Sequence, residues 1–296
     1  EAADALFTSQ PGISKQIRLL EEELGIQIFI RSGKRVVSVS QPGKAVLEIS
    51  ERILRDVQNI KNIGSEFTDH DSGSLTIATT HTQARYALPK IVAEFVKNYP
   101  KVNLTIKQGS PSAIAQMVSS GEADLAIITE RIDDHPELGK LPCYEWNHAV
   151  IVPHDHPLLD CRNPLSLEDL ASFPLVTYEF AFNSGSSIAR TFNKAHIEQP
   201  DVALSAADTD VLKTYVRLGL GVGLMAKMAY DPVVDQDLQL IDAAHLFEPS
   251  PTWIALRSDT YLRGYAYDFI QIFAPKLTRE VVDRILYTPV VEDFSI

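Results

Sequence analysis

Apolar residues recur with a helical period near the start of the chain, in the segment TSQPGISKQIRLLEEELG. Four of them lie three or four positions apart and form one apolar stripe: Ile13, Ile17, Leu20 and Leu24. Ser9 is a suitable N-cap residue, and Pro11 falls in the first turn, where its missing N–H costs little. The pattern therefore predicts an amphipathic helix that begins after Ser9.

The opposite arc of this helix carries small, polar and basic residues: Pro11, Ser14, Lys15 and Arg18. A preceding helical fragment, EAADALF, is joined to it by a tight turn, which is the layout of a helix-turn-helix motif. Such a face suits insertion into the major groove of DNA, with phosphate contacts on its flank. The alternative interpretation is an ordinary amphipathic helix whose basic face is solvated.

Alternating residues follow in RVVSVS and predict a strand, with Ser32, Gly33 and Lys34 as the turn of a hairpin. Arg31, Lys34 and Arg35 would lie at the tip of this wing, where they could contact backbone phosphates. Between Lys15 and Lys44 six basic and three acidic residues give a local net charge of +3. Because the whole chain carries −12, the rest carries −15, and this split is typical of a DNA-reading head on an acidic body.

A longer helical pattern occupies GKAVLEISERILRDVQNIKNIGSE. Its apolar residues lie near heptad positions a and d: Val46, Ile49, Ile53, Ile60 and Ile63, with Val57 beside Asp56 where a further d residue is expected. About three heptads of this spacing favour a helix that pairs with a partner, although a lone core helix is the alternative. The polar run TDHDSG, residues 68–73, then predicts a hinge.

From Leu75 onward short apolar runs alternate with helical segments, which predicts parallel strands with ligands at their carboxyl ends. The alternation restarts after the segment LPCYEWNHAVIVPHDHP, so we expect two α/β lobes. The final strand and helix, in PTWIALRSDTYLRGYAYDFIQIF, are expected to return to the first lobe. Two strands would then cross between the lobes, with a cleft between them.

Neutral hydrogen-bonding side chains gather where the predicted strands end. Thr80, Thr82 and Gln83 follow the first strand, and Thr129 follows another. In the second lobe a strand is followed by three more such residues: Asn183, Ser184 and Ser186. Neutral dipoles near a helix N-terminus can hold a small oxyanion, so these junctions predict an anion site, with simple helix capping as the alternative. Pro89 indicates that the helix after the first junction begins only there.

Composition and motifs exclude several other classes of protein. No apolar run approaches the roughly 20 residues of a membrane span, and no signal-peptide pattern opens the chain. Cys143 and Cys161 lack metal-binding or disulfide-framework spacing, which favours reduced cysteines in a cytosolic protein. No G-x-S-x-G, H-E-x-x-H or P-loop motif is present, so an enzyme is the weaker class.

Two further motifs invite a cofactor or a metal. The segment LGLGVGLM follows a helix and leads into a strand, which is the wrong order for a dinucleotide-binding turn, so it predicts a helix C-cap with tight packing and no cofactor. The segment HDHP (His154, Asp155 and His156) lies at a strand end, where successive side chains point to opposite sides, and we interpret it as a surface turn and not as a metal site.

The amino-terminal 42 residues resemble the winged helix-turn-helix of LysR-type transcriptional regulators. The shared pattern is Ser-Gln-Pro, Ser-Lys-Gln-Ile, Leu-Glu, Leu-Gly, Phe-x-Arg and Pro-x-Gly, all in order. The resemblance implies that the DNA-reading helix presents Ser9, Gln10, Pro11, Ser14, Lys15 and Arg18. It also implies a further helix before Glu1, so this chain is expected to lack the first helix of the domain.

The resemblance extends over essentially the whole chain. It is most specific in IATTHTQARYALP, LPCYEWN, TYVRLGLGVG and YDFIQIFAPKLTR, which resemble the family members that activate sulfur assimilation and cysteine biosynthesis. In those members the cleft accepts sulfate, thiosulfate or an acetylated serine. The implied contacts are Thr80, Thr82, Gln83 and Thr129, with Trp146 as a further candidate. The family's hydroxyl in the second lobe falls at Asn183, a departure that could shift ligand preference.

We therefore predict a winged helix-turn-helix domain at 1–42, a linker and dimerisation helix at 43–72, one lobe at 73–144 and 249–296, and a second lobe at 145–248. The lobes are expected to be Rossmann-like and similar to periplasmic solute-binding proteins. The expected partners are promoter DNA, a small anionic effector (sulfate, thiosulfate, O- or N-acetylserine), further copies of the chain in a dimer or tetramer, and RNA polymerase, in the cytoplasm. The alternative is a solute-binding protein for a small oxyanion.

Overall fold

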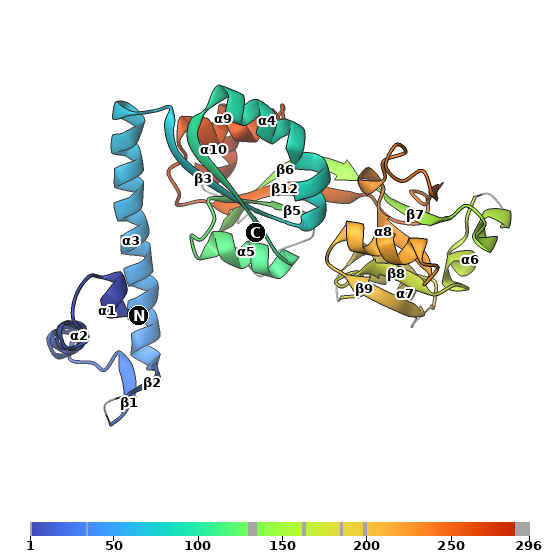
Figure 1. The fold of residues 1–296 in the computed structure, drawn as a ribbon. Coiled ribbons are helices and arrows are strands. Elements are labelled where there is room, and N and C mark those ends of the chain that lie inside the picture. Colours follow the sequence, from blue (N-terminus) through green and yellow to red (C-terminus); the bar gives the residue numbers. More distant parts are fainter. Residues whose placement is uncertain are drawn as a thin grey trace, which may run out of the picture. The chain divides into compact units, whose positions relative to one another are not determined.

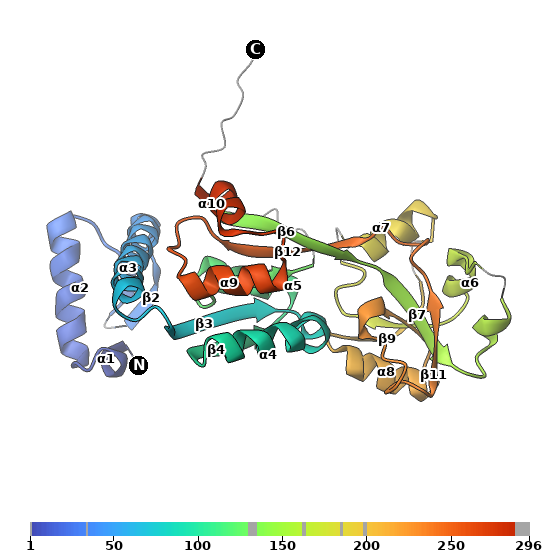
Figure 2. The same cartoon turned by 90° about the horizontal axis from the view of Figure 1, so that it is seen from above.

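A computed structural model describes residues 2–33, 35–129, 135–161, 164–183, 186–197 and 200–287. The chain divides into two compact units, Glu1–Gly64 and Ser65–Ile296. Figures 1 and 2 show their secondary structure, and each unit is described by itself. None of the helices in the described ranges is both long enough and apolar enough to cross a membrane.

The first unit begins with the predicted pair of helices, α1 (Ala2–Ala5) and α2 (Gln10–Leu24). Ser9 caps α2 by accepting a hydrogen bond from the N–H of Gly12 at 3.2 Å, and Pro11 lies in the first turn. The helix ends at Gly25, whose φ of 66° is left-handed and favours glycine. The apolar stripe is only partly covered, because Leu20 and Leu24 are 42% and 47% exposed.

The predicted wing is an antiparallel hairpin of β1 (Phe29–Ser32) and β2 (Arg35–Val39). Glu21 of α2 holds the start of this hairpin, since its carboxylate accepts the N–H groups of Ile28 and Phe29 at 2.8 and 3.1 Å. The N–H of Phe29 in particular keeps the pKa of Glu21 below its usual value. Lys34, expected at the tip of the wing, lies outside the described residues.

The predicted linker is one continuous helix, α3 (Gln41–Thr68). Its heptad residues face outward, with Ile49, Ile53, Val57, Ile60 and Ile63 between 40% and 68% exposed. Gly43 near its start lies so close to the hairpin that a Cβ would be 2.1 Å from the carbonyl oxygen of Ile28. Only glycine fits at this crossing.

The carboxyl end of α3 is anchored within the second unit by a buried arginine. The Arg263 guanidinium, 7% exposed, donates to the carbonyl oxygens of Ser65 and Asp69 at 3.2 and 2.6 Å, and to the Glu66 carboxylate at 3.1 Å. Glu66 in turn accepts the N–H of Gly264 at 3.1 Å, at the start of helix α9. Arg263 thus places a positive charge at the carboxyl end of α3, and Glu66 places a negative charge at the amino end of α9. The helix dipoles favour both placements.

The first lobe of the second unit holds one sheet in the strand order β4-β3-β5-β12-β6. Its strands are β3 (Ser72–Thr79), β4 (Lys101–Gln108), β5 (Leu125–Ile128), β6 (Leu138–Trp146) and β12 (Ser250–Arg257). Its helices are α4 (Leu88–Asn98), α5 (Pro111–Ser119), α9 (Gly264–Phe273) and α10 (Arg279–Tyr287). As predicted, the last strand and helix of the chain return to this lobe.

The second lobe holds a sheet in the order β11-β7-β10-β8-β9. Its strands are β7 (His148–Pro153), β8 (Leu175–Tyr178), β9 (Val202–Ala206), β10 (Val222–Ala226) and β11 (Leu238–Asp242). Its α-helices are α6 (Leu167–Ala171), α7 (Ser187–Lys194) and α8 (Thr209–Arg217), and Pro157–Asp160 and Lys227–Ala229 form 3₁₀ turns. Each sheet has its own hydrophobic core.

Both sheets are mixed, whereas the alternating pattern predicted parallel strands. The strands joined by helices are parallel: β3 pairs in parallel with β4 and β5, and β8 with β9 and β10. The crossing strands run the other way, since β12 is antiparallel to β5 and β6, and β7 to β10 and β11. The chain passes between the lobes at Asn147 and again after β11, so these strands lack a helical crossover that would keep them parallel.

The glycine-rich segment after α8 has the predicted packing role. Gly219 has a left-handed φ of 74° just beyond the helix. A Cβ at Gly221 would lie 2.3 Å from the carbonyl oxygen of Pro174, and a Cβ at Gly223 2.5 Å from the Ile151 side chain. The glycines end the helix and admit close backbone contact.

Candidate binding site between the two lobes

The junction after β3 contains the threonines that the sequence singled out. Thr79 is a strand residue, fully buried, and its hydroxyl donates to the carbonyl oxygen of Ile127 at 3.1 Å. After Thr80 the chain turns through a π-helical segment, Gln83–Ala87, before α4 begins at Leu88. Pro89 has no N–H to continue the preceding turn, which explains why the regular helix starts only there, as predicted.

Thr82 and Gln83 are buried and already bonded to other side chains. The Thr82 hydroxyl lies 2.9 Å from the hydroxyl of Thr209 and 3.4 Å from that of Tyr178, both in the second lobe. The Gln83 carbonyl accepts the hydroxyl of Tyr144 at 2.5 Å. In this arrangement Thr82 joins the two lobes, and neither residue lines either of the two cavities described below.

Thr80 opens into a cavity of about 360 Å³, here called the Thr80 cavity. The first lobe contributes Thr80, His81, Gln108, Gly109 and Ser110; the second contributes Glu179, Phe180, Ala207 and Asp208. Thr80 is 6% exposed, and its hydroxyl has no hydrogen-bond partner within the described residues. A threonine hydroxyl that lines a cavity and is not engaged by a described protein group can bond to a ligand there.

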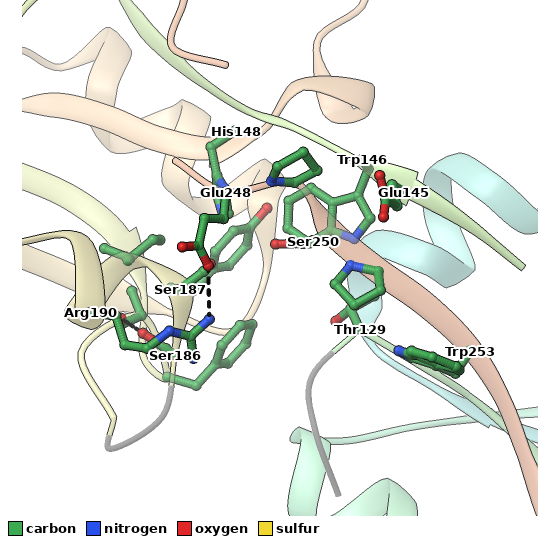
Figure 3. A pocket seen from close by; sticks show the side chains of 16 residues that line it. Thr129, Glu145, Trp146, His148, Ser186, Ser187, Arg190, Glu248, Ser250 and Trp253 are labelled. Carbon is green, nitrogen blue, oxygen red and sulfur yellow. Dashed lines mark hydrogen bonds and ion pairs between the residues drawn. The ribbon is translucent and has the colours of Figure 1, made fainter. Parts of the chain in front are cut away.

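Thr129 and Trp146 open into a second cavity of about 330 Å³, here called the Trp146 cavity. Figure 3 shows Thr129, Trp146 and Trp253 on one side of it and Arg190 and Glu248 on the other. Arg190 and Glu248 form an ion pair at 3.8 Å. Phe180 lines both cavities and stacks on Tyr178 with ring centroids 5.1 Å apart.

Two nitrogen atoms at the Trp146 cavity are buried without a partner among the residues described: the indole Nε1 of Trp146 and Nδ1 of His148. His148 is 3% exposed and packs against the rings of Trp146 and Phe247. Burial lowers the pKa of His148 to about 4, so this imidazole is neutral at physiological pH. The cavity therefore offers neutral groups, aromatic walls and one ion pair.

The second-lobe junction is arranged differently from the sequence expectation. Asn183 is exposed and does not line either described cavity. Ser186 lines the Trp146 cavity, but its hydroxyl already donates to the carbonyl oxygen of Ala181 and accepts the N–H of Ala189, as the N-cap of α7. Ser184 lies outside the described residues.

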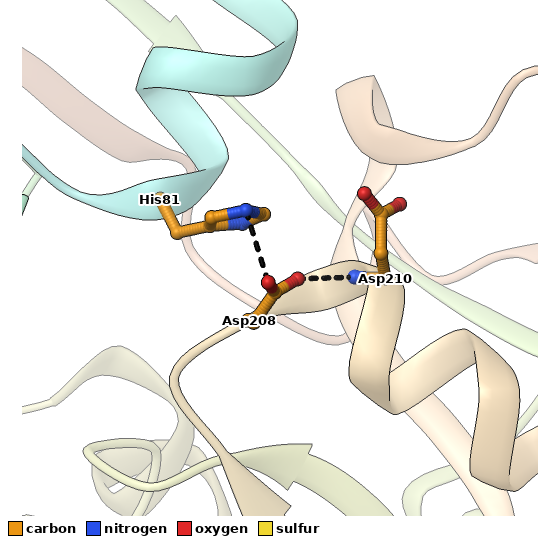
Figure 4. Close-up of side chains that lie close together, drawn as sticks. All are labelled: His81, Asp208 and Asp210. Atoms are coloured by element: carbon orange, nitrogen blue, oxygen red, sulfur yellow. Dashed lines mark hydrogen bonds and ion pairs between the residues drawn. The ribbon is translucent and has the colours of Figure 1, made fainter.

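Three ionisable groups cluster at the rim of the Thr80 cavity: His81, Asp208 and Asp210, whose nearest ligand atoms lie within 4.8 Å of one another (Figure 4). Nε2 of His81 is 3.0 Å from the Asp208 carboxylate, which also accepts the N–H of Asp210 at 2.7 Å. The Asp210 carboxylate accepts hydrogen bonds from Arg85 and Tyr86. The bonds from His81, Arg85 and Tyr86 run between the lobes, so protein groups already engage both carboxylates.

The residues of the HDHP segment have structural partners. Nε2 of His154 is 2.7 Å from the carbonyl oxygen of Gln236, and Nδ1 of His156 accepts the N–H of Leu158 at 3.1 Å. Cys143 and Cys161 are free thiols, and burial raises the pKa of Cys143 to about 12. These two histidines and two cysteines are not among the residues that line either cavity.

The predicted DNA-reading residues lie on the surface of the first unit. Gln10, Pro11, Lys15 and Arg18 are exposed on α2, and Arg31 and Arg35 on the hairpin. Ser14 is half-buried, while the exposed Ser9 is engaged as the N-cap. The unit therefore presents these cations to solvent, where phosphates could reach them.

Several residues at the two cavities were not singled out in the sequence. His81 lay inside the segment already marked, but Glu179, His148 and Asp208 gave no signal beyond their position near strand or helix ends. Arg190 and Glu248 are far apart in sequence, and only the fold pairs them.

A helix-turn-helix unit followed by a two-lobed α/β unit with interlobe cavities defines a class of ligand-responsive DNA-binding regulators. Residues 1–44 match the family described as "Bacterial regulatory helix-turn-helix protein, lysR family", and residues 68–278 match "LysR substrate binding domain". The chain belongs to the LysR family of transcriptional regulators.

Its relatives are regulators as well. It is similar to the HTH-type transcriptional regulators CysB and SsuR of Burkholderia cenocepacia, with 51% and 50% identity over 97% of this chain and 91% and 92% of theirs. It is 43% identical to the regulator cbl of Escherichia coli, over 96% of this chain and 89% of that one. The crystal structure of the cofactor-binding domain of the Cbl regulator superposes with a TM-score of 0.67 at 39% identity, covering 73% of this chain and 95% of that one.

Proposed function

We propose that this LysR-type regulator controls genes of sulfur assimilation and cysteine biosynthesis in response to a small effector bound between its lobes. The effector is sulfate, thiosulfate or an acetylated serine. The supporting observation is the 51% identity to a regulator named CysB over nearly the whole chain, together with the buried residues Thr80 and Thr129 in the walls of interlobe cavities.

In this proposal residues 1–42 read promoter DNA and residues 73–144, 145–248 and 249–296 form the effector lobes. A ligand that contacts Thr80 or Thr129 acts beside the cross-lobe bonds of Thr82 and His81. It therefore has a different affinity for open and closed lobes, which is the condition for a population shift. Arg263 ties the first lobe to the end of α3, which gives the change a route toward the DNA-reading unit.

The exposed apolar row on α3 supports self-association through residues 43–72. Heptad residues that remain 40% to 68% exposed are buried when a second copy of the helix packs against them. We propose a dimer through this helix, with assembly to a tetramer, in the cytoplasm, and with RNA polymerase as the partner at the promoter. A solute-binding protein for a small oxyanion, the alternative from the body alone, leaves the helix-turn-helix unit and α3 without a role.

The effector assignment predicts a selective loss in the variant Thr80→Val. This change keeps the shape of the side chain but removes the hydroxyl, so calorimetric binding of the effectors should weaken about tenfold or more. Binding to promoter DNA in the absence of effector should remain. The matched control is Thr105→Val, which removes an exposed hydroxyl on strand β4. Equal effector affinity in the wild type and Thr80→Val would remove Thr80 from the site.

A further inference from the structure

Glu21, in the last turn of α2, holds the loop that leads into the hairpin. Its backbone carbonyl accepts the N–H of Ile26 at 3.2 Å. One oxygen of its carboxylate accepts the N–H groups of Ile28 and Phe29 at 2.8 and 3.1 Å. Three N–H groups at the entrance to the hairpin therefore bond to a single residue of α2.

The other side of the same loop is held from the start of α3. The N–H of Ser40 donates to the carbonyl oxygen of Ile28 at 2.9 Å, and the Ser40 hydroxyl donates to that of Gln27. Ile28 is 3% exposed and Ser40 9% exposed. Because this anchor is independent of Glu21, a change at Glu21 alters how the hairpin sits against α2 and leaves the hairpin itself in place.

The charge of Glu21 opposes DNA binding, because Glu21 lies near cations of both elements. The N–H of Phe29 is the largest cause of its lowered pKa, and the charges of Arg31 in the hairpin and Arg18 in α2 lower the pKa further. Both arginines are exposed. A carboxylate beside cations that contact phosphates repels those phosphates. Any favourable effect of Glu21 on DNA binding must therefore come from its hydrogen bonds.

From these contacts we infer that Glu21 is a positioning residue for DNA recognition. By accepting the N–H groups of Ile28 and Phe29, it fixes the hairpin at an angle to α2 that lets helix and hairpin contact phosphates at the same time. The inference rests on the proposed DNA-reading role of residues 1–42, and it adds how the two contact surfaces are held together. The length of the side chain and its acceptor oxygen matter, and its charge does not.

Two substitutions separate length from charge. Glu21→Gln keeps the length and an acceptor oxygen but removes the charge, whereas Glu21→Asp keeps the charge but is shorter by a methylene group. Each full-length variant is titrated by anisotropy with a labelled duplex from a cysteine-biosynthesis promoter. Glu21→Gln should bind as tightly as the wild type or more tightly, and Glu21→Asp about fivefold more weakly. At a surface carboxylate without this role, the Asp variant would bind as the wild type does.

A double-mutant cycle assigns the loss to the hairpin. In a chain that already carries Arg31→Ala and Arg35→Ala, Glu21→Asp should cause no further loss, because the contacts that it misplaces are absent. In a Lys15→Ala chain it should cause the full loss. Glu22→Asp is the matched control, since Glu22 is the next residue of the same helix and is exposed, and it should leave the affinity unchanged.

The inference is overturned if Glu21→Asp binds DNA as the wild type does, or if Glu21→Gln or Glu22→Asp is as weak as Glu21→Asp. An equal loss in the two backgrounds of the cycle also overturns it, since a general weakening of the fold would act in this way. If Lys15→Ala and the Arg31→Ala, Arg35→Ala pair both keep wild-type affinity, the DNA-reading assignment of residues 1–42 fails instead, whatever the Glu21 variants do.

Discussion

Replacing Asp235 by asparagine should lower the free energy of unfolding of the two-lobed unit by about 3–5 kcal/mol at neutral pH. Asp235 is 1% exposed, and its carboxylate accepts hydrogen bonds from Lys213 at 2.6 Å and from Arg217 at 2.8 Å. Lys213 itself is only 3% exposed. The substitution therefore leaves a buried ammonium group without its counter-charge.

The effect should depend on pH. Burial alone would raise the pKa of Asp235, but the N–H of Asp231 and the cations of Lys213 and Arg217 outweigh it and lower the pKa below its ordinary value. A lowered native pKa means that the stabilisation is fully present above the unfolded value and is lost as the pH falls through the native one. The difference between the wild type and Asp235→Asn should therefore shrink in acid.

Denaturant unfolding followed by tryptophan fluorescence measures this difference. Both tryptophans, Trp146 and Trp253, lie in the two-lobed unit, so the signal reports that unit alone. Asp237→Asn is the matched control, because Asp237 also pairs with Arg217 but its side chain is 57% exposed. It should cost less than about 1 kcal/mol. Similar losses in both variants would contradict the assigned role of the buried pair.

Removing two cations from α2 should abolish most of the affinity for promoter DNA. In the double variant Lys15→Ala, Arg18→Ala, we expect binding to a promoter fragment to weaken about tenfold or more. The slope of the logarithm of the binding constant against the logarithm of the salt concentration should also become shallower, by about one unit for each phosphate contact that is lost. Both side chains are exposed, so the fold should be unaffected. Anisotropy titrations at several salt concentrations measure affinity and slope together.

The control must remove the same charge elsewhere. Lys90→Ala, Lys97→Ala takes two exposed cations from α4 in the two-lobed unit. If DNA binding depends on the face of α2, this variant keeps its affinity, and both variants keep calorimetric effector binding. An equal loss in the two double variants would mean that net charge, and not α2, governs the affinity.

Much of the fold could be predicted because local physics and tertiary structure agree. Ser9 and Pro11 mark the start of α2, the turn with Gly33 joins the hairpin, and Pro89 sets the start of α4. The alternation of strands and helices indicated two lobes. It could not show that the crossing strands are antiparallel, since that depends on the direction in which the chain enters each sheet after leaving the other lobe.

The site was predicted less completely because polar side chains take partners that are distant in sequence. Thr82 bonds Thr209, 127 positions away, and Gln83 bonds Tyr144. Thr80 and Thr129 looked equivalent to Thr82 in the sequence, yet they open into two different cavities. Hydrogen-bonding capacity is visible in a sequence, but whether the protein itself uses that capacity is decided by packing.

The most direct test of the account is a footprint of the protein on promoter DNA with and without O-acetyl-L-serine, in the wild type and in Thr80→Val. The central claim is that a ligand between the lobes changes how the helix-turn-helix unit engages DNA. The account predicts that the effector alters the affinity or the length of the protected region in the wild type, and that Thr80→Val binds DNA but no longer responds. A wild-type footprint that is unchanged at saturating effector would contradict it.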